Sequence, residues 1–321
     1  MPTRRRLREY LCWLLLTALA ACGAGPQSSS GRPAPSIADS GPPAESSPPS
    51  GSGSVEPIPS EIPAFTVFAP GVISSDDEEY RISFTPDGQT AYFARGSEFF
   101  PQTRQAAILE SHLVDGTWTE PVVVSFSGTY PDIDPWVSPD GNSIYFSSIR
   151  PVGGEPRPDV EVWRVDRAGD GWGEPVHLAA IGSTSDELGA SVTADGVVWF
   201  ASERPGGTGG WDLYTAQPSA DGFATPEPVA AFNTLAWEFN PAISADGTLL
   251  AFTSINREGG SGLGDLFVAR QIDGQWAAEE PVPVNSGADE YHPSFSPDGT
   301  TLYFVRRAAN GDLYETPLPP Q

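Results

Sequence analysis

The chain has 321 residues, 17 basic and 42 acidic side chains and a formal net charge of −25, and every basic residue is an arginine. Such an acidic chain is poorly suited to bind nucleic acid or anionic lipid head groups, which are also negatively charged. With only two cysteines, neither a disulfide framework nor a cysteine-ligated metal site is expected.

The first 22 residues have the order of a lipoprotein signal. Arg4–Arg6 and Arg8 precede an apolar segment, 11–18, which is too short to span a bilayer. Residues 19–22 read Leu-Ala-Ala-Cys and resemble the bacterial lipobox, in which the signal is removed before a cysteine that then takes a diacylglyceryl group. The resemblance implies a signal peptide over 1–21 and lipidation of Cys22; an ordinary secretory signal and an uncleaved anchor are the alternatives.

Several acyl chains on one cysteine give lasting membrane attachment, so we expect a lipid-anchored protein of the cell envelope. Gly23, rather than Asp, follows the cysteine. In a Gram-negative source this resembles a lipoprotein sorted to the outer membrane or facing the periplasm. Residues 22–63 then form a tether of mostly Ser, Pro, Gly, Ala and Glu, which is expected to stay disordered because it has few large apolar side chains.

One phrase recurs five times after the tether: an apolar residue, Ser or Thr, Pro or Ala, then Asp-Gly. Proline presets φ, aspartate bonds its own backbone and glycine accepts positive φ, so each copy predicts a tight structural turn. Self-similarity at a period of 51 to 55 residues indicates one unit that is copied and stacked. The repeat aspartates are Asp87, Asp140, Asp195, Asp246 and Asp298.

Each copy predicts four antiparallel strands, which together make one blade of a β-propeller. In the last copy the strands are 293–297, 301–305 and 312–316, and no fourth strand follows. A strand at about 64–72 precedes the first copy and can supply the missing one. We therefore predict an all-β fold, a five-bladed propeller over 64–321 whose ring closes when this N-terminal strand completes the last blade.

Two motifs resemble the WD40-like propeller repeat of TolB type. One is the Ser-Pro-Asp-Gly turn before a Tyr-Phe strand. The other is a Ser-x-Arg-Pro-x-Gly hairpin before Asp-Leu-Tyr, clearest at 202–207 and 212–214. Family members include periplasmic propellers that dock on other envelope proteins. The resemblance therefore implies the propeller fold and an envelope location, with a docking role as one expectation.

An acidic residue stands eight positions before each repeat aspartate, at the start of the strand that should line the central channel. Two positions later the residue differs in every blade, and such variety is typical of a surface shaped for a particular ligand. Together they form the candidate ligand site at one mouth of the channel. The acids are Glu79, Asp132, Glu187, Glu238 and Glu290, and the second set is Arg81, Asp134, Gly189, Asn240 and His292.

Two interpretations of the acids remain open. In the structural one, each accepts hydrogen bonds from the backbone of a neighbouring blade or from an arginine. In the functional one, crowded carboxylates shift one another's pKa and bind a cation or a polar ligand. The pattern marks no catalytic residue and no dedicated metal ligands; a divalent cation at the ring of acids is the one cofactor that it allows.

The function expected from the sequence is binding. The chain would be a monomeric, lipid-anchored envelope propeller that contacts the membrane only through its lipid and binds an envelope protein or a cell-wall polymer. The alternative is a carbohydrate-active enzyme of glycosidase type, since glycoside hydrolysis needs two carboxylates at a defined separation. Nothing in the sequence distinguishes an acid from a base among the five, so the pattern favours the non-enzymatic role.

Overall fold

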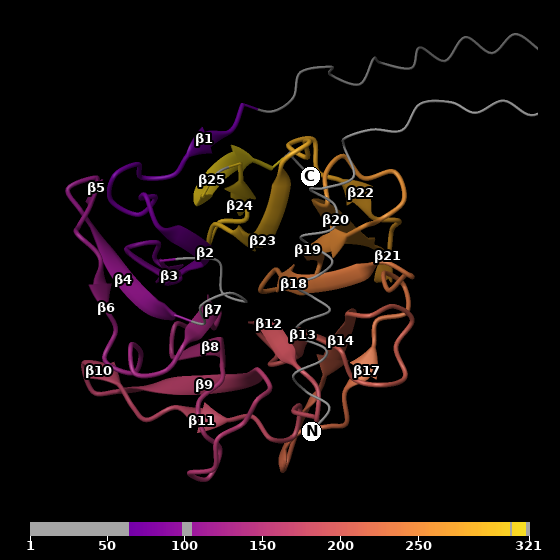
Figure 1. Cartoon of the computed structure of the whole chain (residues 1–321), viewed down its shortest axis with the longest axis horizontal. Coiled ribbons are helices and arrows are strands. Elements are labelled where there is room, and N and C mark those ends of the chain that lie inside the picture. Colours follow the sequence, from indigo (N-terminus) through magenta and orange to yellow (C-terminus); the bar gives the residue numbers. More distant parts are fainter. Residues whose placement is uncertain (1–63, 98–104, 309, 319–321) are drawn as a thin grey trace, which may run out of the picture. The chain divides into compact units, whose positions relative to one another are not determined.

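The computed structural model describes residues 64–97, 105–308 and 310–318. The predicted signal peptide, Cys22 and the whole of the tether lie outside them. Within the described residues the chain is all-β, and its main sheets are five small antiparallel ones arranged around a common axis (Figure 1). The predicted five-bladed propeller is confirmed. No helix in this part of the chain is long and apolar enough to cross a membrane.

Each blade begins with its innermost strand and proceeds outward. Blade 1 contains β2 (Glu78–Phe84), β3 (Thr90–Gly96), β4 (Ala106–Val114), β5 (Thr117–Trp118) and β6 (Val122–Val123); blade 2 contains β7 (Asp132–Val137), β8 (Ser143–Ser148), β9 (Glu161–Ala168), β10 (Gly171–Trp172) and β11 (Val176–His177). Blade 3 contains β12 (Glu187–Val192), β13 (Val198–Ser202), β14 (Asp212–Ala216), β15 (Pro218–Ser219), β16 (Gly222–Phe223) and β17 (Glu227–Pro228). Blade 4 contains β18 (Trp237–Ile243), β19 (Leu249–Ile255), β20 (Gly264–Ile272), β21 (Gln275–Trp276) and β22 (Glu280–Pro281); blade 5 contains β23 (Asp289–Phe295), β24 (Thr301–Arg307) and β25 (Gly311–Pro317).

The ring is closed by the N-terminal strand β1 (Thr66–Val67), as predicted. It pairs antiparallel with β25, with Thr66 opposite Glu315. The strand is shorter than the predicted 64–72, because the chain turns directly after it: the Ile73 N–H donates to the Ala69 carbonyl at 2.9 Å. Closure in this way leaves blade 5 without an unpaired outer edge on β25.

The predicted fourth strand of each blade is shorter than expected and broken in two. In blade 1, β5 pairs with the end of β4 and β6 with its middle, so that Trp118 lies opposite Leu113 and Val123 opposite Leu109. The break contains Pro121, which has no N–H to donate to a sheet ladder. Two short pieces also recur in blades 2 to 4, but in blade 3 the first of them, β16, pairs with β15 and not with the third strand β14.

The repeat turns adopt the predicted geometry. In the first, Gly88 N–H donates to the Thr85 carbonyl at 2.8 Å, and the Thr85 hydroxyl donates to the Asp87 carboxylate at 2.6 Å. The glycine of every repeat turn has φ between 68° and 89°, a conformation that side chains with a Cβ rarely adopt. The turn chemistry therefore explains why Asp-Gly recurs.

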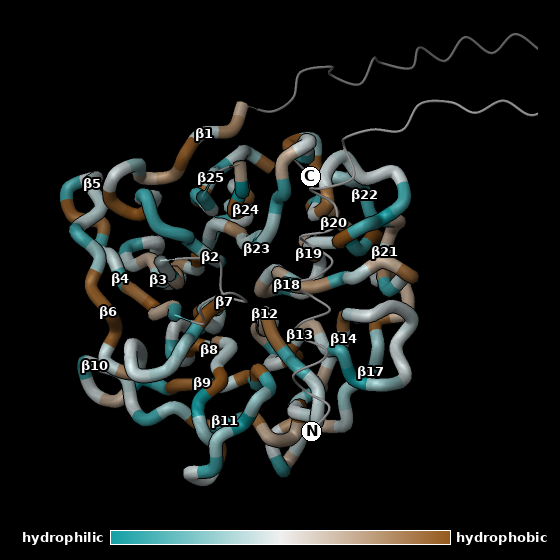
Figure 2. Tube along the Cα trace, in the orientation of Figure 1, coloured by the Kyte–Doolittle hydropathy of each residue, from teal (hydrophilic) through white to brown (hydrophobic). Residues whose placement is uncertain are grey.

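The hydrophobic core lies mainly between neighbouring blades. Aromatic rings of one blade pack edge-on against those of the next, as Trp172 does on Tyr92 and Trp276 on Trp199, with ring centroids 5.8 Å apart in both pairs. Figure 2 shows hydrophobic stretches on strands such as β4 and β9, whereas several outer segments, β17 among them, are hydrophilic. Stacking the blades thus buries faces that no single blade could cover.

Candidate functional site

The five predicted acids are buried at the start of the innermost strands. Each is at most 1% exposed. Each accepts a hydrogen bond, 2.5 to 2.7 Å long, from a hydroxyl in the loop just before its own strand. The hydroxyl donors are Ser75, Ser127, Ser183, Thr234 and Ser286.

An arginine at the far end of the second strand, or in the hairpin after it, lies against each acid. The closest nitrogen–oxygen distances are 2.6 to 3.4 Å. The guanidinium groups also donate to carbonyls of the loop that arrives from the preceding blade; Arg306, for example, donates to Val284 at 3.0 Å. The arginines are Arg95, Arg150, Arg204, Arg257 and Arg306.

These contacts favour the structural interpretation of the acids. Burial raises the pKa of Glu79 to about 7, although Ser75 and Arg95 act in the opposite direction. Burial also raises the pKa of Asp132, Glu187 and Glu238. Because every carboxylate is buried and hydrogen-bonded within the protein, none is presented to a ligand at a channel mouth. Among the described residues no group of three or more His, Cys, Asp and Glu side chains is placed to hold a metal ion.

The second set of predicted residues meets on the propeller axis. Arg81, which is fully buried, crosses the axis from blade 1 and donates at 2.7 to 3.1 Å to carbonyls of two other blades. Burial lowers the pKa of Arg81 to about 10, and the charge of Asp134 partly offsets this. The carbonyls belong to Gly189, Ala190, Asn240 and Pro241.

Asp134 of blade 2 connects blade 5 to this network and makes a second link to blade 4. Its carboxylate lies 2.9 Å from Nδ1 of His292 and accepts a hydrogen bond from Asn240 at 3.1 Å. Burial acts to raise the pKa of Asp134, but His292, Arg81 and Asn240 together hold it below its ordinary value. All four side chains of the set are at most 9% exposed. They pack against one another and fill the axis instead of forming a surface.

Gly189, the fifth member of the set, lies where this network needs space. Its φ is +67°, and a Cβ there would lie 2.8 Å from the Asn240 Cα. The absence of a side chain in blade 3 therefore leaves room for Asn240 and for the guanidinium of Arg81. One long side chain and one glycine, on different blades, share the same level of the axis.

The next level of the axis, four positions before each repeat aspartate, has its own exception. Blade 2 places Trp136 there, whereas the other blades have Ser83, Ser191, Ala242 and Ser294. The Trp136 ring lies under the Arg81 guanidinium, 5.2 Å from ring centroid to Cζ. Its indole N–H is buried and has no hydrogen-bond partner within the described part of the chain. This side chain closes the axis from the side of the repeat turns.

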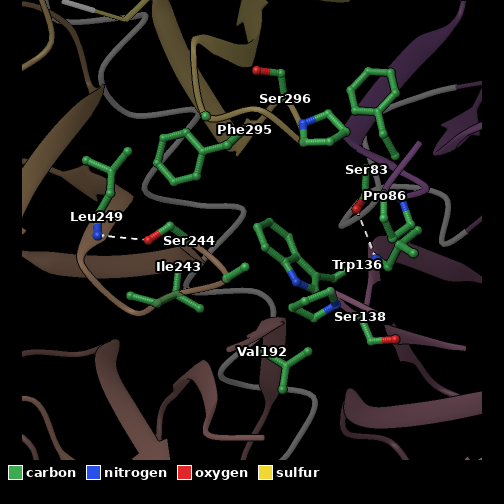
Figure 3. A pocket seen from close by; sticks show the side chains of 16 residues that line it. Ser83, Pro86, Trp136, Ser138, Val192, Ile243, Ser244, Leu249, Phe295 and Ser296 are labelled. Carbon is green, nitrogen blue, oxygen red and sulfur yellow. Dashed lines mark hydrogen bonds between the residues drawn. The ribbon is translucent and has the colours of Figure 1, made fainter. Parts of the chain in front are cut away.

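A cavity of about 170 Å³ opens beyond Trp136 at the repeat turns. Figure 3 shows side chains from all five blades around it, with the indole of Trp136 lying across its middle. We call this cavity the axial socket. One apolar residue per blade, three positions before the repeat aspartate, lines it; these residues are Phe84, Val137, Val192, Ile243 and Phe295.

The sequence pattern indicated the positions of the acids and of the second set, but not their partners or the axial socket. A signal for the arginines was present, since an arginine follows each acid by 16 to 19 residues. The hydroxyl residue four or five positions before each acid was also readable. For the socket the only signal was Trp136, a large residue where the other copies have small ones.

No protein-family model and no curated protein matches this chain in sequence. Several solved structures are similar in fold. A glycoside hydrolase is 10% identical, covers 81% of this chain and 92% of its own length, and has a TM-score of 0.55. A glucose dehydrogenase is 12% identical, with coverage of 80% and 100% and a TM-score of 0.47.

A third similar structure is a protein provisionally designated TolB from Agrobacterium tumefaciens. It is 20% identical, covers 73% of this chain and 72% of its own length, and has a TM-score of 0.46. The predicted resemblance to TolB-type propellers agrees with this fold. At such identities the likeness to these structures concerns the fold alone, and a shared fold does not imply a shared function.

Proposed function

We propose that this chain is a lipid-anchored binding module of the bacterial envelope that docks a protein partner through the axial socket. The observation that carries the proposal is the socket itself: an apolar cavity on the propeller axis, built from the same position of every blade. The buried Trp136 N–H supports it, because a group inserted into the socket could accept the hydrogen bond that this donor lacks.

The size of the socket suits one side chain of a larger partner. Sites for small molecules usually enclose about 300 to 1,000 Å³, whereas the socket has about 170 Å³. Hot spots in protein interfaces are typically single anchoring side chains in well-packed pockets of this kind. The size therefore favours a protein that inserts an apolar side chain over a free small molecule.

The rim around the socket is acidic. All five repeat aspartates are exposed. Hydrogen bonds from the neighbouring Ser or Thr hydroxyl, and then from turn N–H groups, lower the pKa of four of them, which keeps them charged near neutral pH; these are Asp87, Asp140, Asp246 and Asp298. An apolar anchor flanked by basic residues would be complementary to this face.

The alternative, a glycosidase using carboxylates at the axis, gains no support from the geometry. Such an enzyme needs one carboxyl group to protonate the leaving oxygen and a second to act as nucleophile or base. The axial carboxylates are instead bonded to a hydroxyl and an arginine of their own blade. Asp134, the one acid on the axis itself, is occupied by His292 and Asn240.

The proposal is tested by photo-crosslinking in cells that produce the full chain. A photoreactive phenylalanine analogue replaces Pro297, which lines the socket. We expect an adduct with one protein of defined mass, because the probe would contact the inserted anchor. Glu258 is exposed in the hairpin between β19 and β20, at the end of these strands opposite the repeat turn. It is the control position, which should give no such adduct.

A second variant blocks the socket without disturbing buried residues. Ala245, at the turn position of blade 4 equivalent to Pro297, is exposed and lines the socket, so Ala245→Trp should cover it and abolish the adduct formed from position 297. An adduct that survives Ala245→Trp, or that forms equally from position 258, would show that the partner binds elsewhere. Absence of any adduct from position 297 would also reject the socket as the docking site.

Lipid attachment is tested separately. In cells fed a labelled fatty acid, the wild-type chain should carry the label and sediment with membranes, because acyl chains on Cys22 would hold it there. Cys22→Ser should lose the label and leave the membrane fraction. Cys12→Ser removes the other cysteine, lies in the predicted signal peptide and should change neither result. A Cys22→Ser chain that stays labelled would contradict the lipobox interpretation.

A further inference from the structure

A second hollow lies between blades 3 and 4 on the side of the repeat turns. It has a volume of about 420 Å³, within the range of small-molecule sites. Blade 3 contributes Trp199 and Gln217 to its walls, and blade 4 contributes Trp276 and Gln271. We call this hollow the blade 3–4 groove.

The groove is separated from the axial socket by a backbone contact between the turns of these two blades. The Ala194 N–H of the blade 3 turn donates to the Ala245 carbonyl of the blade 4 turn at 2.7 Å. The turns of blades 1, 2 and 5 have proline at the position of Ala194, and proline has no N–H to donate. The two hollows are therefore distinct, and a ligand in the groove needs no partner in the socket.

The polar side chains of the groove are available to a ligand. Among the described residues the side chains of Thr215, Gln217 and Gln271 form no hydrogen bond. Each amide offers both donors and an acceptor, and the hydroxyl offers one donor and two lone pairs. Trp276 is partly exposed in the groove and packs edge-on against Trp199, 5.8 Å between centroids. The groove thus combines indole surface with hydrogen-bonding groups of both kinds.

The charge of the groove limits what can enter. Asp195, Glu227 and Asp246 line it and no arginine does. The pKa of Asp246 is lowered, first by the hydrogen bond from Ser244, so this carboxylate is charged near neutral pH. A phosphate or a carboxylate in the ligand would be repelled, whereas hydroxyl groups or an amine would be attracted.

From these features we propose that the blade 3–4 groove is a saccharide-binding site that takes neutral or amine-bearing sugar units and rejects uronic acids. A sugar ring presents C–H faces that suit the indoles and hydroxyls that pair with the free amides and Thr215. Its ring oxygens and hydroxyls need both donors and acceptors, which the groove supplies together. This site goes beyond the proposed docking function and does not depend on it.

The test compares three trisaccharides that differ in charge, made of glucosamine, glucose or glucuronic acid. Each is titrated into the full chain in detergent, and the heat of binding is measured. We expect the glucosamine trimer to bind at least as tightly as the glucose trimer and the glucuronic acid trimer not to bind. The proposal would be overturned if neither the glucosamine nor the glucose trimer binds, or if the glucuronic acid trimer binds as tightly as they do.

A matched pair of glutamine variants locates the site. Gln271→Leu keeps the size of the side chain in the groove but removes its hydrogen bonds, and should weaken binding about three- to tenfold. Gln275→Leu changes an exposed glutamine of the same blade outside the groove and should leave binding unchanged. Equal effects of the two variants, or none from Gln271→Leu, would place any sugar binding elsewhere and so reject the groove.

Discussion

Replacement of Arg81 by methionine is expected to lower the free energy of unfolding by about 4 kcal/mol, since removing one of two buried charges that attract each other, here Arg81 and Asp134, costs about 3–5 kcal/mol. The guanidinium is fully buried and donates to carbonyls of blades 3 and 4. Methionine would leave these acceptors without donors and would remove the guanidinium charge that acts on Asp134. In a domain of this size such a loss corresponds to a fall of about 10 °C in the thermal midpoint.

The comparison that isolates the axial network is Arg164→Met. Arg164 is half-buried on β9, the third strand of blade 2, and pairs with the exposed Asp166, a contact worth at most about 1 kcal/mol. The double variant Arg81→Met with Asp134→Asn should regain part of the lost unfolding free energy, because no buried carboxylate then lacks a neighbouring positive charge. Thermal and urea unfolding measure all three; similar losses for Arg81→Met and Arg164→Met would contradict a special role for the axis.

The fold could be predicted because the repeat is local chemistry. Each Asp-Gly turn depends on residues within five positions of one another, so the sequence alone reveals the turn, its flanking strands and the period. Ring closure could also be predicted, because the last copy has no fourth strand and the N-terminal strand belongs to no copy of its own. The exact length of β1 was not, because the turn after Val67 depends on a backbone hydrogen bond between Ala69 and Ile73.

The site was harder to predict because its contacts cross the ring. Arg81 bonds to residues 108 to 160 positions away, and no sequence pattern indicates which blade a long side chain will reach. The variety of residues at this level suggested a surface, whereas it reflects one irregular set of partners: Arg81, Asp134 and His292 carry charge or hydrogen bonds, and Gly189 leaves space. A repeat predicts the structure that all blades have in common, but not how residues that differ between blades pack against one another.

A different exception concerns Glu161 of blade 2, whose environment should make the fold less stable as the pH rises. The equivalent residues of blades 3 and 4 are Asp212 and Asp265, which accept N–H groups from the hairpin before them. Glu161 is longer and lies instead 2.6 Å from Arg157 and 3.2 Å from His177. Burial, and then the nearby charge of Glu187, raises the pKa of Glu161 to about 8.

The direction of the pH dependence follows from the pKa values of Glu161 in the unfolded and the folded protein. An unfolded glutamate ionises near 4.5, while folded Glu161 keeps its proton until about pH 8, so its contribution to stability is full below 4.5 and is lost as the pH rises to 8. The raised pKa of Glu79 also makes the fold less stable as the pH rises, up to about pH 7. Burial, and then Arg157, lowers the pKa of His177. A lowered histidine pKa makes the fold more stable as the pH rises, but only below the pKa of the unfolded histidine, near 6.5. Between pH 6.5 and 8 the fall should therefore be visible.

The expected result is a loss of about 2 kcal/mol of unfolding free energy between pH 6.5 and 8, at 1.36 kcal/mol per pH unit for one proton. Urea unfolding at several pH values measures it. Glu161→Gln removes the titrating proton and should flatten the curve above pH 7, while Glu258→Gln, at an exposed hairpin position, should leave it unchanged. A wild-type curve that is flat or rising over this range would mean that Arg157 outweighs burial at Glu161, and that this carboxylate is already charged in the folded protein.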